Sequence, residues 1–333
     1  MRKICLIFLS TSAFDGKPLI TAFEKAFSEL ELDAEIRTVH ASPSGIISLQ
    51  ELNGFKRLVR DCSANRFVIF HSGMLELFLE EPDFLLLFSA YRTSFNSDRV
   101  RVLPHIWTPT GVPEDTGFLN WSAKPALRLG FMGTLHGTSR LQKLVLSSPR
   151  FIRNWLLSGA YLRNTHLNAA ANGLGFTTRS LNTFVRSETL DALRLRQSKY
   201  KNVQLEIIER QAFTGSQQHM LEYREHLQAN TYIICPRGIE NYSYRMYEAL
   251  NFGRVPVIID TDMVLPKEID WDNLCVRVPY ASLDKIYDYI LEDYYSKTEQ
   301  DFIDRQHAAI STMLKLQTTD WVKVAVQEIL ARK

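Results

Sequence analysis

The sequence lacks the features that mark several classes of protein. Its four cysteines show no C-x-x-C spacing, and most lie in apolar runs, so they predict small core residues of a reducing compartment rather than a zinc or disulfide framework. The formal net charge is only +2, so bulk charge does not imply a nucleic-acid-binding surface. No stretch approaches the roughly 18 apolar residues of a membrane span. These absences favour a soluble cytoplasmic protein.

The amino terminus also lacks a signal-peptide core. Its apolar stretch, residues 4–9, is shorter than the usual range of about 7 to 15 residues for such a core. A buried first strand explains it better.

The first third of the chain alternates short apolar runs with helical patterns. Strands are predicted over 4–10, 34–40, 67–72 and 100–104, and helices over 17–30 and 48–62. Such alternation predicts a parallel sheet with helices on both faces. Because 333 residues exceed what one core usually organises, we expect a second domain.

A segment rich in proline and glycine, 108–125, predicts a linker, after which the pattern restarts. Strands are predicted over 127–134, 203–209, 231–236, 255–260 and 273–279, and helices over 216–229, 243–252 and the tail. The fold class is therefore α/β with two doubly wound, Rossmann-like domains. We predict an N-terminal domain (1–125), a C-terminal domain (126–305) and terminal helices (306–333), for which the N-terminal domain is one docking surface.

The stretch from Cys235 to Asp260 concentrates charge between two predicted strands. Pro236 ends the first strand, which puts Arg237 just past its carboxyl end. Ser243 or Asn241 can cap the following helix, whose N-terminus then faces the same edge as Arg237.

Within that helix, Arg245 lies in the first turn and Glu248 three residues later, on the same face. A cation in the first turn is unfavourable without an anionic partner. Two arginines, a helix N-terminus and a carboxylate predict a cradle for a nucleoside diphosphate, with Glu248 accepting hydrogen bonds from the ribose. A solvated surface ion pair between Arg245 and Glu248 is the alternative.

The motif CPRG-x4-YSYRMYEAL-x2-G-x-VPVIIDTDMVLP-x3-IDW resembles the signature region of the exostosin-type glycosyltransferases, glycosyltransferase family 47. The resemblance covers about a seventh of the chain. It implies a GT-B fold, in which two Rossmann-like domains face each other across a cleft, and an inverting, metal-independent transfer of sugar. It also implies that Arg237, Ser243, Arg245 and Glu248 contact the nucleotide-sugar donor.

Other candidates come from predicted strand ends. An inverting transfer needs one general base from the N-terminal domain, and three residues qualify: Asp15, His71 and His105. Upstream of the motif, His136 and Arg140 follow a glycine-ended strand and are candidates for donor binding. The spacing of Asp260 and Asp262 would suit a divalent cation, but we expect arginines and the helix dipole to stabilise the leaving group instead, with no cofactor.

The expected activity is that of a hexosyl- or glycuronosyltransferase that uses a nucleotide-diphosphate sugar, a UDP-sugar being the expected donor. The acceptor would be a glycan or a lipid-linked glycan of polysaccharide biosynthesis, and a lipid-linked acceptor would bring peripheral membrane association. No nucleic-acid partner is expected. Two alternatives are a fucosyltransferase-like enzyme that uses a GDP-sugar and a non-catalytic glycan-binding or scaffold protein.

Overall fold

The computed structural model describes residues 3–10, 17–40, 57, 65–70, 84–87, 92, 100–105, 121–134, 149, 152, 178–210, 216–238, 241–317 and 320–331. The chain divides into two compact units. Unit 1 comprises Met1–Pro104, Val264–Glu268 and Lys315–Lys333, and unit 2 comprises His105–Met263 and Ile269–Leu314.

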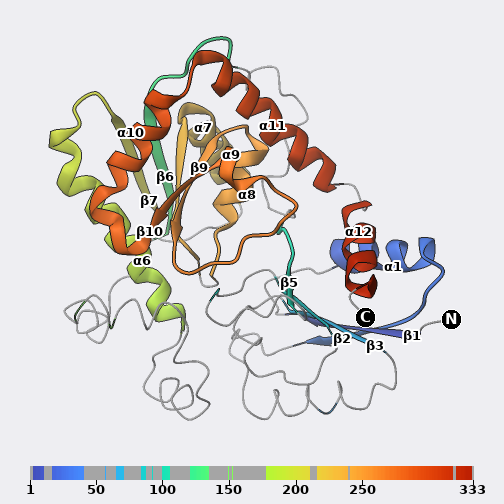
Figure 1. Ribbon diagram of the computed structural model, residues 1–333. Coiled ribbons are helices and arrows are strands. Elements are labelled where there is room, and N and C mark those ends of the chain that lie inside the picture. The colour runs from blue at the N-terminus through green and yellow to red at the C-terminus, as the bar shows by residue number, and fades with distance from the viewer. Residues whose placement is uncertain are drawn as a thin grey trace. The chain divides into compact units, whose positions relative to one another are not determined.

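Unit 1 is built on a five-stranded sheet in the order β2-β1-β3-β4-β5, and all its described pairs are parallel. The strands are β1 (Lys3–Ser10), β2 (Asp33–His40), β3 (Asn65–Phe70), β4 (Phe84–Leu87) and β5 (Val100–Val102). Helix α1 (Lys17–Glu29) connects β1 to β2 (Figure 1). The predicted α/β class and the predicted strands of this unit are confirmed, with shifts of one or two residues at most ends.

Strand β4 was missed by the sequence analysis. Its four residues, FLLL, are all apolar, so they show neither the alternation of a half-buried strand nor the length of a helix. Only its pairing with β3 on one side and β5 on the other identifies it as a strand.

The last helix, α12 (Asp320–Ala331), packs against α1 within unit 1 (Figure 1). Its buried face includes Val322, Ala325 and Val326, which recur at helical spacing. Lys323 forms an ion pair with Glu29 of the partner helix at 3.2 Å.

Unit 1 also contains a buried charged cluster at β5. The guanidinium of Arg101 is nearly buried and contacts Glu268 at 2.5 Å and Glu328 of α12. Lys267 pairs with the same Glu328. Two carboxylates around one buried guanidinium neutralise its charge and hold the short segment Val264–Glu268 against α12.

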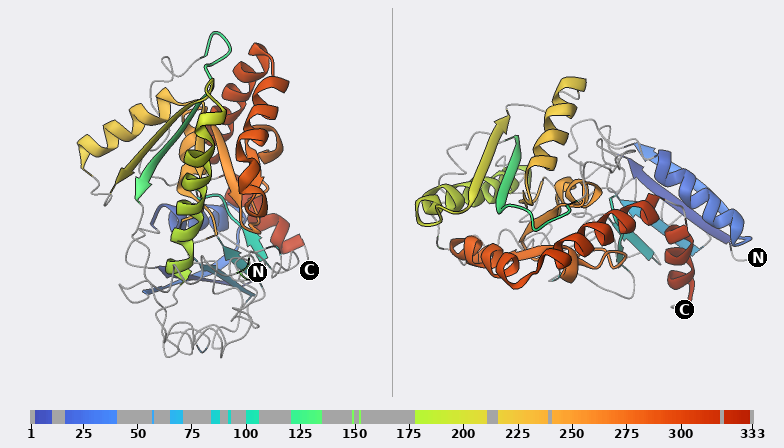
Figure 2. Two further views of the ribbon diagram at one scale, coloured as in Figure 1. Left: turned by 90° about the vertical axis from the view of Figure 1, so that its left-hand side faces the viewer. Right: turned by 90° about the horizontal axis from the view of Figure 1, so that it is seen from above.

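Unit 2 has a second five-stranded parallel sheet, in the order β10-β9-β8-β6-β7. Its strands are β6 (Arg128–Thr134), β7 (Gln204–Arg210), β8 (Tyr232–Cys235), β9 (Val255–Asp260) and β10 (Val276–Pro279). The helices of the second half of the chain are α6 (Thr178–Arg196), α7 (Gln217–Ala229), α8 (Tyr244–Asn251), α9 (Trp271–Leu274), α10 (Ile286–Ser296) and α11 (Glu299–Gln317), with 3-10 turns η4 (Gln197–Lys199) and η5 (Tyr280–Lys285). Helix α7 lies on one face of the sheet, and α6 and α10 lie on the other (Figure 2).

The predicted strand 273–279 begins later than expected. Residues 271–274 form the short helix α9, because the Asp270 side chain accepts a hydrogen bond from the backbone N–H of Asn273 and so caps a helical turn. The strand itself starts at Val276.

Both sheets have the same strand order when numbered from their first strand: 2-1-3-4-5. In such a sheet the connection reverses direction between the first and third strands, and ligands bind beyond the carboxyl ends of the strands at this switch point. In unit 2 the switch point lies between β6 and β8, which pair through Leu129 with Tyr232 and Gly130 with Ile233. The end of β8 is where the charged stretch begins.

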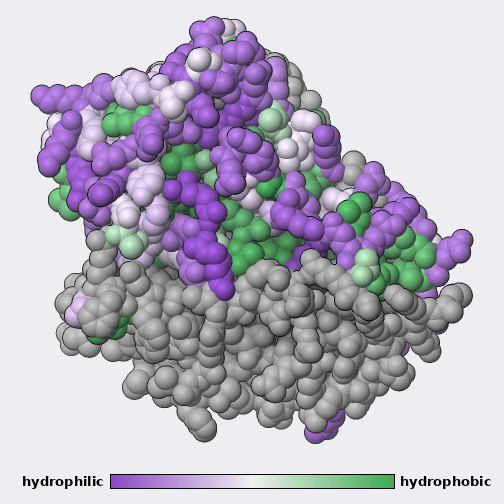
Figure 3. Space-filling view, in the orientation of Figure 1, coloured by the Kyte–Doolittle hydropathy of each residue, from purple (hydrophilic) through white to green (hydrophobic). Residues whose placement is uncertain are grey.

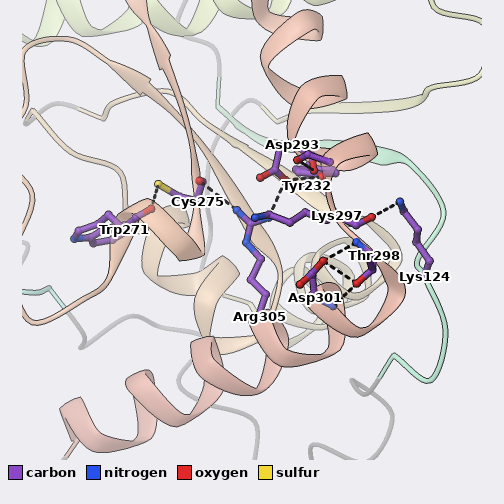
Figure 4. Close-up of polar contacts among 10 residues, drawn as sticks. Lys124, Tyr232, Trp271, Cys275, Asp293, Lys297, Thr298, Asp301 and Arg305 are labelled. Atoms are coloured by element: carbon purple, nitrogen blue, oxygen red, sulfur yellow. Dashed lines mark hydrogen bonds and ion pairs between the residues drawn. The ribbon is translucent and has the colours of Figure 1, made fainter.

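A buried polar network fixes helices α10 and α11 to the sheet of unit 2 (Figure 4). Arg305 of α11 donates to Asp293 of α10 at 2.7 Å and to the carbonyl of Cys275 at 3.2 Å. The hydroxyl of Tyr232, in the centre of the sheet, donates to the same Asp293 carboxylate at 2.8 Å. The network therefore joins two helices to strand β8 through the Asp293 carboxylate, and to the residue before strand β10 through the Arg305 guanidinium.

The described cysteines Cys235 and Cys275 are free and buried, which confirms their prediction as small core residues. Hydrophilic residues cover much of the described surface that Figure 3 presents, with smaller hydrophobic areas among them. None of the helices in the described ranges is long and apolar enough to cross a membrane.

Candidate nucleotide-binding site

The signature stretch folds into a strand, a short loop and helix α8, as the sequence predicts. The loop is closed by a backbone hydrogen bond of 2.7 Å from Gly238 N to Tyr242 O. The apolar stripe of α8, which consists of Met246, Ala249 and Leu250, is fully buried. Gly253 has φ of +61°, the left-handed conformation that commonly follows the end of a helix and that glycine adopts without strain.

The N-terminus of α8 carries a hydroxyl without a partner. Ser243 is the N-cap residue, but its side chain makes no capping hydrogen bond, and its buried Oγ has no hydrogen-bond partner among the residues that the structure describes. The other predicted cap, Asn241, instead accepts a hydrogen bond of 2.6 Å from Thr261 of the loop after β9. A buried, unsatisfied hydroxyl costs free energy, and an anion at the helix N-terminus would satisfy it.

Arg245 reaches from α8 across to strand β6. Its Nε donates to the carbonyl of Met132 at 2.9 Å, and its guanidinium lies over the ring of Phe131 at 4.8 Å. A Cβ atom on Gly133 would lie only 1.8 Å from Arg245 Nη2, so the glycine at this position leaves the space that the guanidinium occupies. The glycine-ended strand noted in the sequence thus shapes the site through Arg245.

The other two charged residues of the motif are buried. Arg237 is 1% exposed and Glu248 is 6% exposed. Tyr223 of α7 donates a hydrogen bond of 2.6 Å to Glu248 Oε2, and burial together with the Glu248 charge raises the pKa of Tyr223 well above its usual value. The alternative of a solvated surface pair is therefore wrong for Glu248.

The structure adds Arg186, which the sequence analysis did not single out. From helix α6, its Nε donates to the carbonyl of Arg237 at 3.1 Å, and its Nη1 donates to the carbonyl of Thr134 at 3.1 Å. Burial, and next the nearby Arg245 charge, lower the pKa of Arg186 to about 9, so the side chain is still a cation at neutral pH. Nothing in the sequence distinguishes Arg186 from the other arginines of this basic helix.

These residues gather at the carboxyl ends of β6 and β8 in unit 2. A family model described as the exostosin GT47 domain matches residues 153–293, which span α6 and the whole signature stretch. The resemblance to exostosins is confirmed. The exostosin GT47 region thus contains Arg186, Arg237, Ser243, Arg245 and Glu248.

The curated relatives match a shorter part of the chain. A probable glucuronosyltransferase of Oryza sativa subsp. japonica is 41% identical over 68 residues, which cover 20% of this chain and 16% of that protein. The probable beta-1,4-xylosyltransferase IRX10L of Arabidopsis thaliana is 40% identical over 68 residues, with the same shares. The matched segments therefore make up about a sixth of each relative's length.

Two solved structures are similar to this chain at low sequence identity. The crystal structure of TarM is 9% identical with a TM-score of 0.41, over 89% of this chain and 54% of that chain. A glycosyltransferase from Rickettsia africae ESF-5 is 10% identical with a TM-score of 0.41, over 99% of this chain and 98% of that chain.

The first residue of the acidic pair after β9, Asp260, already accepts hydrogen bonds. Asp260 Oδ2 accepts a hydrogen bond of 2.6 Å from Arg277, and its Oδ1 accepts one of 3.1 Å from the backbone N–H of Met263. Asp262 adopts φ of +65°, in the left-handed region. In the described part of the chain, no three histidine, cysteine or carboxylate side chains gather in a group that could hold a metal ion.

One candidate base can be placed. His105 belongs to unit 2 and not to the N-terminal unit from which a base was expected. It is 1% exposed, stacks on Tyr242 and meets the edge of Tyr244 at a centroid distance of 4.5 Å. This packing favours a structural role at the start of α8. The candidates Asp15, His71, His136 and Arg140 lie outside the described residues.

Proposed function

We propose that this protein is a glycosyltransferase that binds the diphosphate of a nucleotide-sugar at the carboxyl edge of the unit 2 sheet. The observation that carries the proposal is the buried, unpartnered Ser243 hydroxyl at the N-terminus of α8, flanked in sequence by the buried Arg237 and by Arg245. A helix N-terminus, a hydroxyl and guanidinium groups are the donors that phosphates prefer. The match to the exostosin GT47 domain supports transfer of sugar as the reaction.

In this proposal Arg237 and Arg245 neutralise the diphosphate, and Glu248 accepts hydrogen bonds from the ribose hydroxyls. The hydrogen bond from Tyr223 occupies one oxygen of Glu248 and holds the carboxylate in one orientation. We propose a UDP-sugar as donor and a glycan or lipid-linked glycan as acceptor. The names of the curated relatives, glucuronosyltransferases and xylosyltransferases, support a donor of this kind.

We propose an inverting transfer without a metal. Both oxygens of Asp260 already accept hydrogen bonds, and Arg277 compensates its charge, which disfavours a divalent cation at the Asp260 and Asp262 pair. Guanidinium groups and the dipole of α8 can stabilise the leaving diphosphate instead. For the base, Asp15 and His71 are proposed, because in the sequence they follow β1 and β3, the strands that flank the switch point of unit 1.

The test is calorimetric titration of the whole chain with UDP, GDP, UMP and pyrophosphate. We expect UDP to bind more tightly than GDP. We also expect Glu248→Ala to weaken the binding of UDP but not the binding of pyrophosphate, because only UDP has a ribose. A preference for GDP would support the fucosyltransferase-like alternative. Absence of binding by every nucleotide at millimolar concentration would show that the proposal is wrong.

A second measurement separates an enzyme from a binding protein. UDP release from UDP-glucuronate, UDP-xylose and related donors is followed with oligosaccharide acceptors, with and without a chelator. Activity that survives chelation supports the metal-free reaction. Tight UDP binding without turnover on any acceptor supports a non-catalytic role. Activity that is lost with chelator and restored by a divalent cation would instead indicate that Asp260 and Asp262 bind a metal ion.

A further inference from the structure

The guanidinium of Arg186 bridges the two strands at the switch point of unit 2. It donates to Thr134 O, at the end of β6, and to Arg237 O, just past the end of β8. These strands are neighbours in the sheet, and the crevice between their carboxyl ends is where a doubly wound sheet binds its ligand. One side chain from α6 therefore sets the separation of the two strand ends that border the site.

One nitrogen of this guanidinium remains for a ligand. Nε and Nη1 are used by the two carbonyls, whereas Nη2 has no hydrogen-bond partner among the residues that the structure describes. A Cβ atom on Gly238 would lie 3.5 Å from Nη2, which locates this nitrogen beside the loop that leads into α8. Arg186 thus presents a donor beside the loop that precedes Ser243, the N-cap residue of α8.

A second guanidinium lies close to that of Arg186. Arg245 of α8 is close enough to disfavour its positive charge, and Tyr223 of α7, whose hydroxyl donates to Glu248, weakly favours it. Arg237 contributes another buried guanidinium after β8. A bound polyanion would therefore offset the repulsion between the Arg186 and Arg245 guanidinium groups.

We propose that Arg186 is a third donor-site arginine, which positions the strand ends of β6 and β8 and directs Nη2 at the terminal phosphate of the nucleotide-sugar diphosphate. This inference rests on the proposed function and adds to it a residue from outside the signature motif. A residue that acts on the terminal phosphate discriminates among ligands by their charge. Substitution of a purely structural residue would instead change the affinity for all ligands alike.

The experiment measures dissociation constants of uridine, UMP, UDP and pyrophosphate for wild type, Arg186→Gln and Arg186→Lys. The control is Arg194→Gln, two turns later on the same helix, where the side chain is half exposed and pairs with Glu209. We expect Arg186→Gln to weaken the binding of UDP and pyrophosphate about tenfold or more, because one charge-assisted hydrogen bond is lost. Binding of UMP should weaken less, and binding of uridine should hardly change. Arg194→Gln should leave the dissociation constants of all four ligands unchanged.

Arg186→Lys keeps the charge but cannot bridge both carbonyls, so its UDP affinity should lie between those of wild type and Arg186→Gln. It also serves as the test if Arg186→Gln does not fold, as judged by circular dichroism. Equal weakening of uridine, UMP and UDP, or lysine and glutamine variants that bind UDP as wild type does, would overturn the inference. Wild type that binds no ligand at all would instead refute the proposed function.

Discussion

The substitution Gly133→Ala should weaken nucleotide binding although it adds one methyl group to a strand. The new Cβ would lie 1.8 Å from Arg245 Nη2 and 2.8 Å from its Cζ, both far inside van der Waals contact. The strand backbone is held by its pairing with β7, so the guanidinium is the part that moves.

The displaced guanidinium loses two contacts. Its hydrogen bond to Met132 O contributes about 1 to 2 kcal/mol, and its position over Phe131 contributes about 0.5 to 1 kcal/mol. Replacing glycine by alanine within a strand returns roughly 0.5 to 1 kcal/mol. The net loss of stability is therefore about 1 kcal/mol, a few degrees of Tm.

The effect on binding should be larger than the effect on stability. If Arg245 contacts a phosphate, its removal from the site costs a charged hydrogen bond of about 1.5 to 3 kcal/mol, or roughly a 10- to 100-fold rise in the dissociation constant of UDP. Isothermal calorimetry measures this rise, and thermal unfolding measures the loss of stability in parallel.

Two controls make the test decisive. The first, Arg194→Gln, changes a half-exposed side chain that pairs with Glu209, and it should bind UDP as wild type does. Because Gly133 acts through Arg245, Gly133→Ala combined with Arg245→Ala should bind UDP no more weakly than Arg245→Ala alone. Full UDP affinity in Gly133→Ala, or additive effects in the double variant, would refute the reasoning.

Three further predictions concern stability. Tyr223→Phe removes the hydrogen bond to buried Glu248 and should lower the free energy of unfolding, measured by urea titration, by about 1 to 3 kcal/mol. The control Tyr295→Phe, at an exposed tyrosine, should change the free energy of unfolding little. Equal effects of the two substitutions would contradict the role of the Tyr223–Glu248 hydrogen bond. Arg305→Leu leaves the buried Asp293 beside Tyr232 without its cation and should lower the free energy of unfolding by about 3 to 5 kcal/mol (Figure 4). A decrease below about 1 kcal/mol would mean that Asp293 is solvated. Burial lowers the pKa of His226, and the neighbouring Glu206 partly opposes this effect. The folded state therefore binds fewer protons than the unfolded state once the pH falls below about 6.5. The free energy of unfolding should decline as the pH is lowered from 7.5 to 5, and it should decline less steeply in His226→Gln. A decline of equal slope in His226→Gln would assign the pH dependence to other groups.

The local structure of the signature stretch could be predicted because each step depends on neighbouring residues. Pro236 ends a ladder, Gly253 permits a left-handed turn at φ of +61°, and an apolar stripe at helical spacing specifies which face of α8 is buried. Alternation of strands and helices predicted the α/β class for the same reason. The resemblance to exostosins rests on such a contiguous motif.

Only the tertiary structure decided the features that depend on pairing between distant segments. Strand β4 is defined by its neighbours β3 and β5, and Arg186 becomes part of the site because α6 crosses the ends of β6 and β8. The Ser243 hydroxyl, expected to cap α8, is buried without a partner, and His105 packs between two tyrosines of unit 2. Periodicity and motif spacing encode which residues share a face of one element, whereas contacts between elements depend on how the sheet order folds remote parts of the chain together.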